Sequence, residues 1–274
     1  MAAAGEIALT NSNFRLGSLK ASAISSPVHS TNKVVAELLE FTSIFHGREL
    51  TRKNHRIPSG LRHIDDLIEG GIIKGRISEI IAQPGAGKTS LAAAFATNVT
   101  RREAVAWIDA ADDFDPASIA AAGVELTRLL WVSCCGANKA ASLKAAEWIL
   151  AAGGFGLVIL DFGASSPQLS QSAALRLARA AERSEASVLV LASHRLCGTF
   201  AALSLTLRCK RVGFSNIWPG TPTLFDGQLL EACVTRNKLG RSGRTVKWRS
   251  VVEDNYGLKT TGMQLAAANQ PQAI

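Results

Sequence analysis

Short runs of apolar, strand-forming residues alternate along the middle of the chain with alanine- and leucine-rich stretches of helical character. The strand-like runs are residues 77–81, 105–108, 129–132, 157–160 and 188–191. The helical stretches are residues 88–97, 116–122, 140–152 and 169–183. Because strands that alternate with helices build a mostly parallel sheet covered on both faces, the pattern predicts an α/β fold.

The alternation stops after residue 194. Residues 203–212, 228–236 and 244–249 are strand-like with no helical stretch between them, which predicts an antiparallel extension of the sheet. We expect four segments: a disordered tail at 1–31, a helix and linker at 32–56, the core at 57–253 and a C-terminal tail at 254–274. The first tail shares the Ser- and Ala-rich bias of organellar targeting segments, and the predicted helix packs either on the core or on a neighbouring subunit.

Composition places the chain among folded proteins. It is 47% hydrophobic and 19% charged, which disfavours disorder, and no apolar stretch approaches the roughly 20 residues that span a bilayer. The five cysteines are odd in number and lack a C-x-x-C pair, so neither a disulfide framework nor a zinc site is indicated. A reducing, cytoplasmic setting is expected. The adjacent Cys134 and Cys135 are either a redox pair or small core residues.

Positive charge is concentrated toward the C-terminus. The formal net charge is +8, and residues 200–250 contribute nine basic side chains against two acids, which is +7. The basic residues are Arg208, Lys210, Arg211, Arg236, Lys238, Arg241, Arg244, Lys247 and Arg249. This bias favours a polyanion partner or a phosphate-facing surface over a solvated face, where both signs intersperse. Trp218 and Trp248 lie among them and either stack on bases or pack within the sheet.

A glycine-rich turn follows the first predicted strand and opens the first long helix, as a phosphate-binding loop (P-loop) requires. The turn and the start of the helix comprise Gln83, Pro84, Gly85, Ala86, Gly87, Lys88, Thr89 and Ser90. Backbone N–H groups from Gly85 to Thr89 can cradle phosphate oxygens, and the helix N-terminus adds positive potential. Lys88 would neutralise the β- and γ-phosphates, and Thr89 would bind Mg²⁺. Ala82 stands where the strict pattern has glycine.

A nucleotide-bound Mg²⁺ also needs a carboxylate at the end of a neighbouring buried strand. Residues 157–160 are apolar and Asp161 follows them, which makes Asp161 the candidate. The alternative is that Asp161 caps the next helix. The histidines are scattered without ligand spacing, so no other metal site is expected.

Several stretches beyond this loop resemble the RecA recombinase family, over roughly residues 57–249. Residues 57–61, 64–67 and 75–80, with Gly71, resemble the family's lead-in to its P-loop. Residues 107–116 resemble its segment after the second core strand, and residues 234–239 a late strand that ends in two basic residues around Asn. Residues 197–203, 224–227 and 235–240 look closer still to the RecA-like ImuA family of the bacterial translesion-synthesis mutasome. The resemblance implies a RecA-like P-loop core that binds ATP and Mg²⁺.

The resemblance also implies roles for single residues. Asp115 would lie near the adenine, and His194 stands in place of a glutamine that senses the γ-phosphate. Arg236 and Lys238 match lysines that reach the ATP of a neighbouring subunit, unless they are simply exposed strand residues. If the match carries over, nucleotide would favour a homo-oligomer or association with RecA itself.

Two departures from the family bear on mechanism. Ala111 occupies the position of the glutamate that activates the attacking water, and alanine can neither orient nor deprotonate anything. Asp112 is a candidate only after a one-residue shift, which re-aims its side chain. We therefore expect ATP binding with slow or absent hydrolysis. The segments after Asp161 and His194, which are long DNA-contacting loops in RecA, are short here, so RecA-type strand exchange is not expected.

The leading interpretation is a DNA-damage-response accessory factor of translesion synthesis. Its partners would be a polymerase complex with a Y-family-like subunit, RecA and single-stranded DNA. The competing interpretation is a DNA-stimulated ATPase of the recombinase class, against which Ala111 counts. A third, a cell-division inhibitor, rests only on the association of small RecA-like proteins with damage responses.

Overall fold

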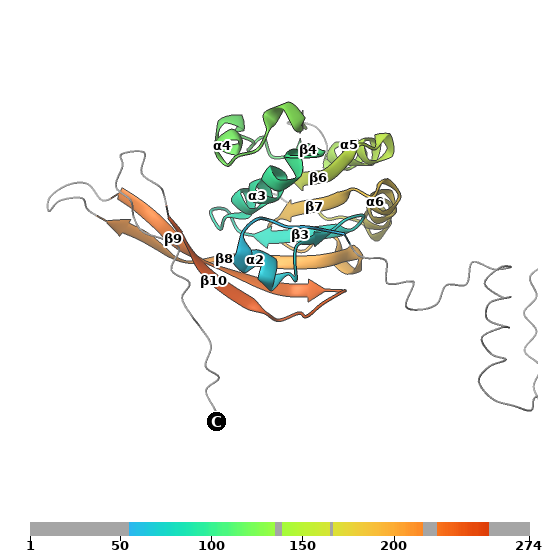
Figure 1. Cartoon of the computed structure of the whole chain (residues 1–274). Coiled ribbons are helices and arrows are strands. Elements are labelled where there is room, and N and C mark those ends of the chain that lie inside the picture. The colour runs from blue at the N-terminus through green and yellow to red at the C-terminus, as the bar shows by residue number, and fades with distance from the viewer. Residues whose placement is uncertain (1–54, 135–138, 165–166, 216–223, 252–274) are drawn as a thin grey trace, which may run out of the picture. The chain divides into compact units, whose positions relative to one another are not determined.

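Eight strands form one mixed sheet in the order β10-β9-β8-β3-β7-β6-β4-β5. The structure is a computed structural model that describes residues 55–134, 139–164, 167–215 and 224–251 (Figure 1). The parallel strands are β3 (Ile77–Ala82), β4 (Ala104–Asp109), β5 (Leu129–Ser133), β6 (Phe155–Asp161), β7 (Ser187–Ala192) and β8 (Ala201–Ser215). Antiparallel to β8 and then to each other run β9 (Leu224–Asn237) and β10 (Thr245–Val251). The predicted α/β fold with an antiparallel extension is confirmed.

Helices cover both faces of the parallel strands. On one face lie α2 (Arg62–Leu67) and α3 (Lys88–Thr100), and on the other lie α5 (Lys139–Ala152) and α6 (Gln171–Ser184) (Figure 1). Between β4 and β5 come α4 (Pro116–Ala121) and a 3-10 turn (Leu126–Arg128), and a second 3-10 turn (Gly198–Phe200) precedes β8. Two hydrophobic clusters result, one on each side of the sheet. The short pair β1 (Arg56–Ile57) and β2 (Ile72–Ile73) lies outside this sheet.

The burial pattern of α6 shows why it docks with one face outward. Its buried residues recur at helical spacing, and Ser170 caps its N-terminus by accepting a hydrogen bond from the Ala173 N–H at 3.3 Å. The buried residues are Ala173, Ala174, Leu177, Ala180 and Ala181. The remaining positions carry the polar and charged side chains of this helix. An arginine-rich face is therefore directed away from the sheet.

The parallel strands bring four chain segments together at one edge of the sheet. β3 ends at Ala82, β4 at Asp109, β6 at Asp161 and β7 at Ala192. Asp109 and Asp161 are register partners, and Ala192 pairs with Ile81. The segments that follow these strands meet where ligands bind in open α/β sheets. This edge therefore positions the candidate site.

Some expectations concern residues outside the described ranges: the tail at 1–31, most of the helix and linker at 32–56, the tail at 254–274, Cys135 and Trp218. All described residues belong to one unit, Lys53–Ile274, and the four-segment division stays a prediction. Cys134 packs half-buried against the core, which agrees with its interpretation as a small core residue. Within the described ranges, no helix is long and apolar enough to cross a membrane.

Candidate nucleotide-binding site

The turn between β3 and α3 has the backbone conformation of a phosphate cradle. Gly85 and Gly87 adopt φ angles of +78° and +82°, which glycine accommodates without strain. A Cβ on Gly85 would meet nothing within 4 Å, so this side of the turn is open. The first turn of α3 has no side-chain cap and no acidic residue, which leaves its N–H groups directed toward an incoming anion. The predicted loop residues therefore lie in a geometry that fits a phosphate group.

Lys88 points into the sheet edge rather than into solvent. Its side chain is buried, and its ammonium group donates a hydrogen bond to the backbone carbonyl of Gly163. Burial lowers the pKa of Lys88, whereas the nearby carboxylates of Asp161 and Asp113 act in the opposite direction. Within the described part of the chain, Lys88 is thus a desolvated cation with no direct carboxylate partner. An anion at this edge would complete its environment.

Asp161 ends β6 beside Lys88 with only 4% of its surface exposed. Burial raises the pKa of Asp161, the Gly163 N–H and Lys88 oppose this effect, and Asp109 and Asp113 reinforce it. The N–H of Gly163 donates to Asp161 at 2.9 Å. Ser170, rather than Asp161, caps α6, so the helix-cap alternative for Asp161 is wrong. The buried carboxylate of Asp161 and the half-buried hydroxyl of Thr89 are oxygen groups of the kind that Mg²⁺ and its water shell prefer.

Asp109 organises the segment that follows β4, a role that sequence reasoning missed. Its buried carboxylate accepts backbone N–H bonds of 2.8 to 3.3 Å from four successive residues, 111–114. Asp112 takes the left-handed conformation, with φ of +62°, and its side chain is exposed. Asp113, rather than Asp112, is the carboxylate whose charge acts on Lys88. Asp112 and Asp113 are adjacent in the sequence, and the sequence alone does not indicate which of the two approaches Lys88.

Ala111 packs directly on the turn that follows β6. A Cβ added to Gly163 would overlap the methyl group of Ala111 and would lie 2.9 Å from Oδ2 of Asp113. Gly163 is also the residue whose carbonyl accepts from Lys88. The position expected to carry a water-activating glutamate therefore carries a methyl group in close contact with backbone. No side chain at this position can act as a general base.

Comparison with known proteins agrees with this geometry. The family model "RecA N-terminal domain" matches residues 41–185, which is more than half of the chain. The chain belongs to the RecA family. The protein RecA of Borrelia hermsii is 36% identical to this chain over 115 residues. The matched residues cover 41% of this chain and 32% of that RecA. The chain thus spans about a third of the length of that curated relative.

Two proteins named RadB also match this RecA-family chain. The DNA repair and recombination protein RadB of Methanobrevibacter smithii is 37% identical over 57 residues, which cover 20% of this chain and 24% of that protein. A crystal structure of the RadB recombinase superposes with a TM-score of 0.54 and 16% identity, and covers 70% of this chain and 95% of that one. The superposition confirms the RecA-like fold.

A buried glutamate on β3 fixes the turn after β7, where His194 lies. The carboxylate of Glu79 accepts from the N–H groups of Leu196, at 2.9 Å, and Cys197, and from the Ser204 hydroxyl at 3.0 Å. Glu79 is 1% exposed, so these bonds form in the core. His194 is exposed at the same sheet edge as the P-loop, with its Nδ1 3.3 Å from the Ser193 hydroxyl. This turn reaches β8 by residue 201, which confirms its shortness in this RecA-family member.

Asp115 caps α4. Its carboxylate accepts from the N–H groups of Ala117 and Ser118, both at 3.1 Å, and from the Ser118 hydroxyl. These bonds, led by the one from the hydroxyl, lower the pKa of Asp115. Among the described residues, these hydrogen bonds join Asp115 to α4 and none joins it to the P-loop. Its adenine-binding role therefore stays a prediction.

Arg236 and Lys238 lie at the opposite sheet edge from the P-loop of their own chain. Asn237, between them, pairs with Leu203, whereas the P-loop follows the far end of β3. Arg236 donates to the Thr199 carbonyl at 3.4 Å. Burial lowers the pKa of Lys238, and the positive charges of Arg236 and Arg76 reinforce this effect. The placement keeps both side chains away from a nucleotide held by their own Lys88.

The other basic residues of the C-terminal strands lie at three places. Arg208 and Lys247 both pair with Glu231, from opposite sides, so the three lie side by side on one face. Strand alternation adds Arg249 to this face. Lys210 lies in a bulge of β8 and joins the face through its ammonium, which is 3.2 Å from Glu231. These four residues form the exposed basic face (Arg208, Lys210, Lys247 and Arg249). Arg241 and Arg244 instead lie at the β9–β10 connection near Glu69, and Arg211 follows a bulge in β8.

Trp248 lies on the other face of the same strands. Its ring packs against the core and stands 5.1 Å from the His63 ring. Of its two proposed roles, sheet packing is therefore the one that its contacts support. Leu230, on the same face, approaches the P-loop, because a Cβ on Gly87 would lie 3.2 Å from it. The antiparallel extension thus packs against the P-loop.

Proposed function

We propose that this RecA-family chain is an ATP-binding accessory protein of DNA-damage-induced translesion synthesis. One observation supports the proposal of ATP binding without efficient hydrolysis: the P-loop is open to phosphate, and Ala111 packs on Gly163 at the position of the expected glutamate. Such a site binds nucleotide and lacks the group that would orient an attacking water. ATP would act as a switch for assembly, with little turnover.

The bound nucleotide would be held by the chain's own groups. The N–H groups of Gly85 to Thr89 and the ammonium of Lys88 would contact the phosphates, and Lys88 would exchange its Gly163 contact for them. The Thr89 hydroxyl and, through water, Asp161 would hold Mg²⁺, whose chemistry is to neutralise phosphate charge. His194 would face the γ-phosphate from the neighbouring strand end, and Asp115 would approach the adenine.

Association would use the opposite sheet edge. Arg236 and Lys238 would contact the nucleotide of a second copy or of RecA, because neither side chain is near its own P-loop. The exposed basic face, together with Arg211, Arg241 and Arg244, would contact single-stranded DNA or an acidic partner. Resemblance to the ImuA family supports the polymerase complex as the partner.

The accessory role is tested by genetics combined with co-purification. Deletion of the gene should lower damage-induced mutation frequency, wild type should restore it, and Lys88→Ala should fail to restore it at equal protein level. The tagged protein should co-purify with an error-prone polymerase complex. Unchanged mutation frequency on deletion, together with a pull-down that recovers no polymerase subunit, contradicts the role.

A recombinase-class, DNA-stimulated ATPase is the second candidate. It is favoured by the names of the relatives, RecA and the DNA repair and recombination protein RadB. It requires a group that activates water, and Asp113 is the carboxylate on the segment after β4 whose charge acts on Lys88. Turnover that rises with single-stranded DNA and falls in Asp113→Asn would favour this function.

A further inference from the structure

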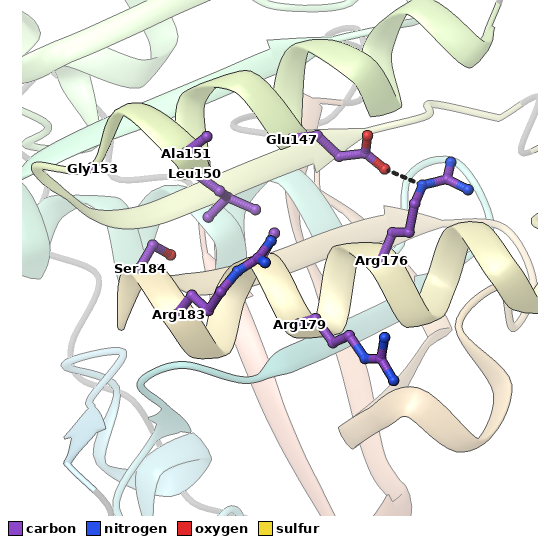
Figure 2. A pocket seen from close by; sticks show the side chains of 9 residues that line it. Glu147, Leu150, Ala151, Gly153, Arg176, Arg179, Arg183 and Ser184 are labelled. Carbon is purple, nitrogen blue, oxygen red and sulfur yellow. Dashed lines mark hydrogen bonds and ion pairs between the residues drawn. The ribbon is translucent and has the colours of Figure 1, made fainter.

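A groove runs between α5 and α6 on the face of the sheet opposite the P-loop helix α3. Its volume is about 790 Å³, and Figure 2 shows the side chains that line it. The floor is apolar, formed by Leu150 and Ala151 of α5 and by Ala180 of α6. Arginines of α6 form its rim: Arg176, Arg179 and Arg183. Neither the P-loop nor the basic face of the antiparallel strands contributes to this groove.

The three arginines stand on α6 at positions i, i+3 and i+7. This spacing places them in a row of about 10 Å along the helix. In Figure 2, Arg176 and Arg183 extend toward α5, and Arg179 points to the other flank of α6. There Arg179 lines a second cavity, of about 380 Å³, together with Arg76 and Lys238. Arg176 and Arg183 therefore border the groove itself, and Arg179 extends the positive charge to the other flank of α6.

Acidic side chains neutralise only part of this charge. Glu147 is 2.9 Å from the Nε of Arg176, and Glu182 is 3.3 Å from Arg76. No ion pair or hydrogen bond from the side chain of Arg179 or Arg183 is formed within the described part of the chain. A surface groove that combines an apolar floor with unpaired arginines is complementary to a ligand with apolar and acidic side chains.

We propose that the α5–α6 groove binds an acidic, amphipathic segment of a partner protein. Apolar side chains of the segment would pack on Leu150, Ala151 and Ala180, and its carboxylates would pair with Arg183 and Arg179. Among the lining residues there is no aromatic ring on which a base could stack, so the lining favours a peptide over single-stranded nucleic acid. This partner site goes beyond the proposed nucleotide switch and does not depend on it.

Fluorescence anisotropy with a defined probe tests the proposal on the full chain. The probe is a labelled helical peptide of about four turns, with leucine at every third or fourth position and glutamate between. Arg179→Glu/Arg183→Glu should weaken its binding at least about tenfold at low salt. The matched control Arg101→Glu, at the end of α3 on the other face, should change affinity less than about twofold.

Two further probes and one variant separate the components. A peptide with glutamine in place of glutamate and one with alanine in place of leucine should both bind more weakly than the parent. Ala151→Trp, which fills the exposed edge of the floor without a charge change, should also weaken the parent peptide. Circular dichroism and nucleotide binding of each variant establish that the fold and the P-loop are intact.

Two results would overturn the proposal. One is unchanged peptide affinity in folded Arg179→Glu/Arg183→Glu, which would show that the groove is not the site. The other is a labelled oligothymidylate that binds more tightly than the peptide and is lost in the same variant, which would assign the groove to nucleic acid. Because nucleotide binding is measured separately, neither result bears on the proposal that the P-loop binds nucleotide.

Discussion

The methyl group of Ala111 and the backbone of Gly163 are in direct contact at the carboxyl ends of β4 and β6. Asp109 fixes this contact from one side through the N–H groups of residues 111–114. Lys88 fixes it from the other side through the Gly163 carbonyl. Residues from three strand ends thus define a candidate phosphate site that has no base at the position of Ala111.

Gly163→Ala should destabilise the protein more than Gly153→Ala. Both glycines have positive φ, +57° and +73°, so alanine adds backbone strain of about 1–2 kcal/mol at either position. Only at Gly163 does the new Cβ also overlap Ala111 and approach Asp113, which should add about 1 kcal/mol or more. Urea unfolding measures the difference. The further change Ala111→Gly should recover part of the loss, and equal losses at both glycines would contradict the contact.

Asp161→Asn should stabilise the nucleotide-free protein at neutral pH. Burial raises the folded-state pKa of Asp161 above its ordinary value, so the folded protein binds this proton more tightly than the unfolded chain. The ionised group is therefore destabilising above its raised pKa, by about 1.4 kcal/mol for each pH unit that separates the folded-state pKa from the unfolded-state pKa. The advantage of the variant should shrink as pH falls through the raised pKa. The midpoints of urea unfolding of wild type and variant, compared at neutral and acidic pH, test this prediction. A variant that is less stable than wild type at neutral pH would contradict it.

Glu79→Leu should loosen the turn after β7. The change orphans the buried N–H groups of Leu196 and Cys197, at about 1–3 kcal/mol for each unsatisfied donor. Burial, and then Glu79, raise the pKa of the Cys197 thiol well above its ordinary value. Thiol labelling should therefore be slow at Cys197 and fast at the exposed Cys209 in wild type. Cys197 should label faster in Glu79→Leu; an unchanged rate would mean that Glu79 does not hold the turn.

Arg236→Ala/Lys238→Ala should weaken ATP-dependent association. Both side chains lie at the sheet edge away from their own P-loop, where positive charge reinforces the lowered pKa of Lys238. A neighbour's triphosphate would relieve that repulsion. Sedimentation velocity with and without ATP measures the effect, alone and with added RecA. Arg101→Ala, at the exposed end of α3, serves as the control. Sedimentation that ATP does not alter in wild type would rule out the assembly role.

Local sequence signals predicted much of the fold. Buried parallel strands such as β6 are continuous apolar runs, and the helices that cover them are alanine- and leucine-rich stretches, so the predicted positions agree with the structure to within a few residues. The P-loop was predictable for a similar reason, because its function requires glycines at fixed positions. The short elements β1, α2 and β2 were not predicted, since two to six residues carry too little periodicity.

Contacts between distant residues could not be predicted from local patterns. The pairing of Arg208 and Lys247 with one glutamate depends on the register of three strands, and a shift of one residue would place these side chains on opposite faces. Asp109 looks like any acid at a strand end until its four N–H donors are seen. The contact of Lys88 with Gly163 joins residues far apart in the chain, and no local pattern encodes it.

The central claim is that the P-loop binds ATP while Ala111 leaves it without efficient hydrolysis. Equilibrium titration with a fluorescent ATP analogue and Mg²⁺, paired with steady-state phosphate release in the presence of single-stranded DNA, tests it in wild type and Lys88→Ala. We predict saturable binding in wild type, loss of binding in Lys88→Ala, and phosphate release that is the same in both proteins. DNA-stimulated phosphate release that disappears in Lys88→Ala would contradict the claim and identify an active ATPase.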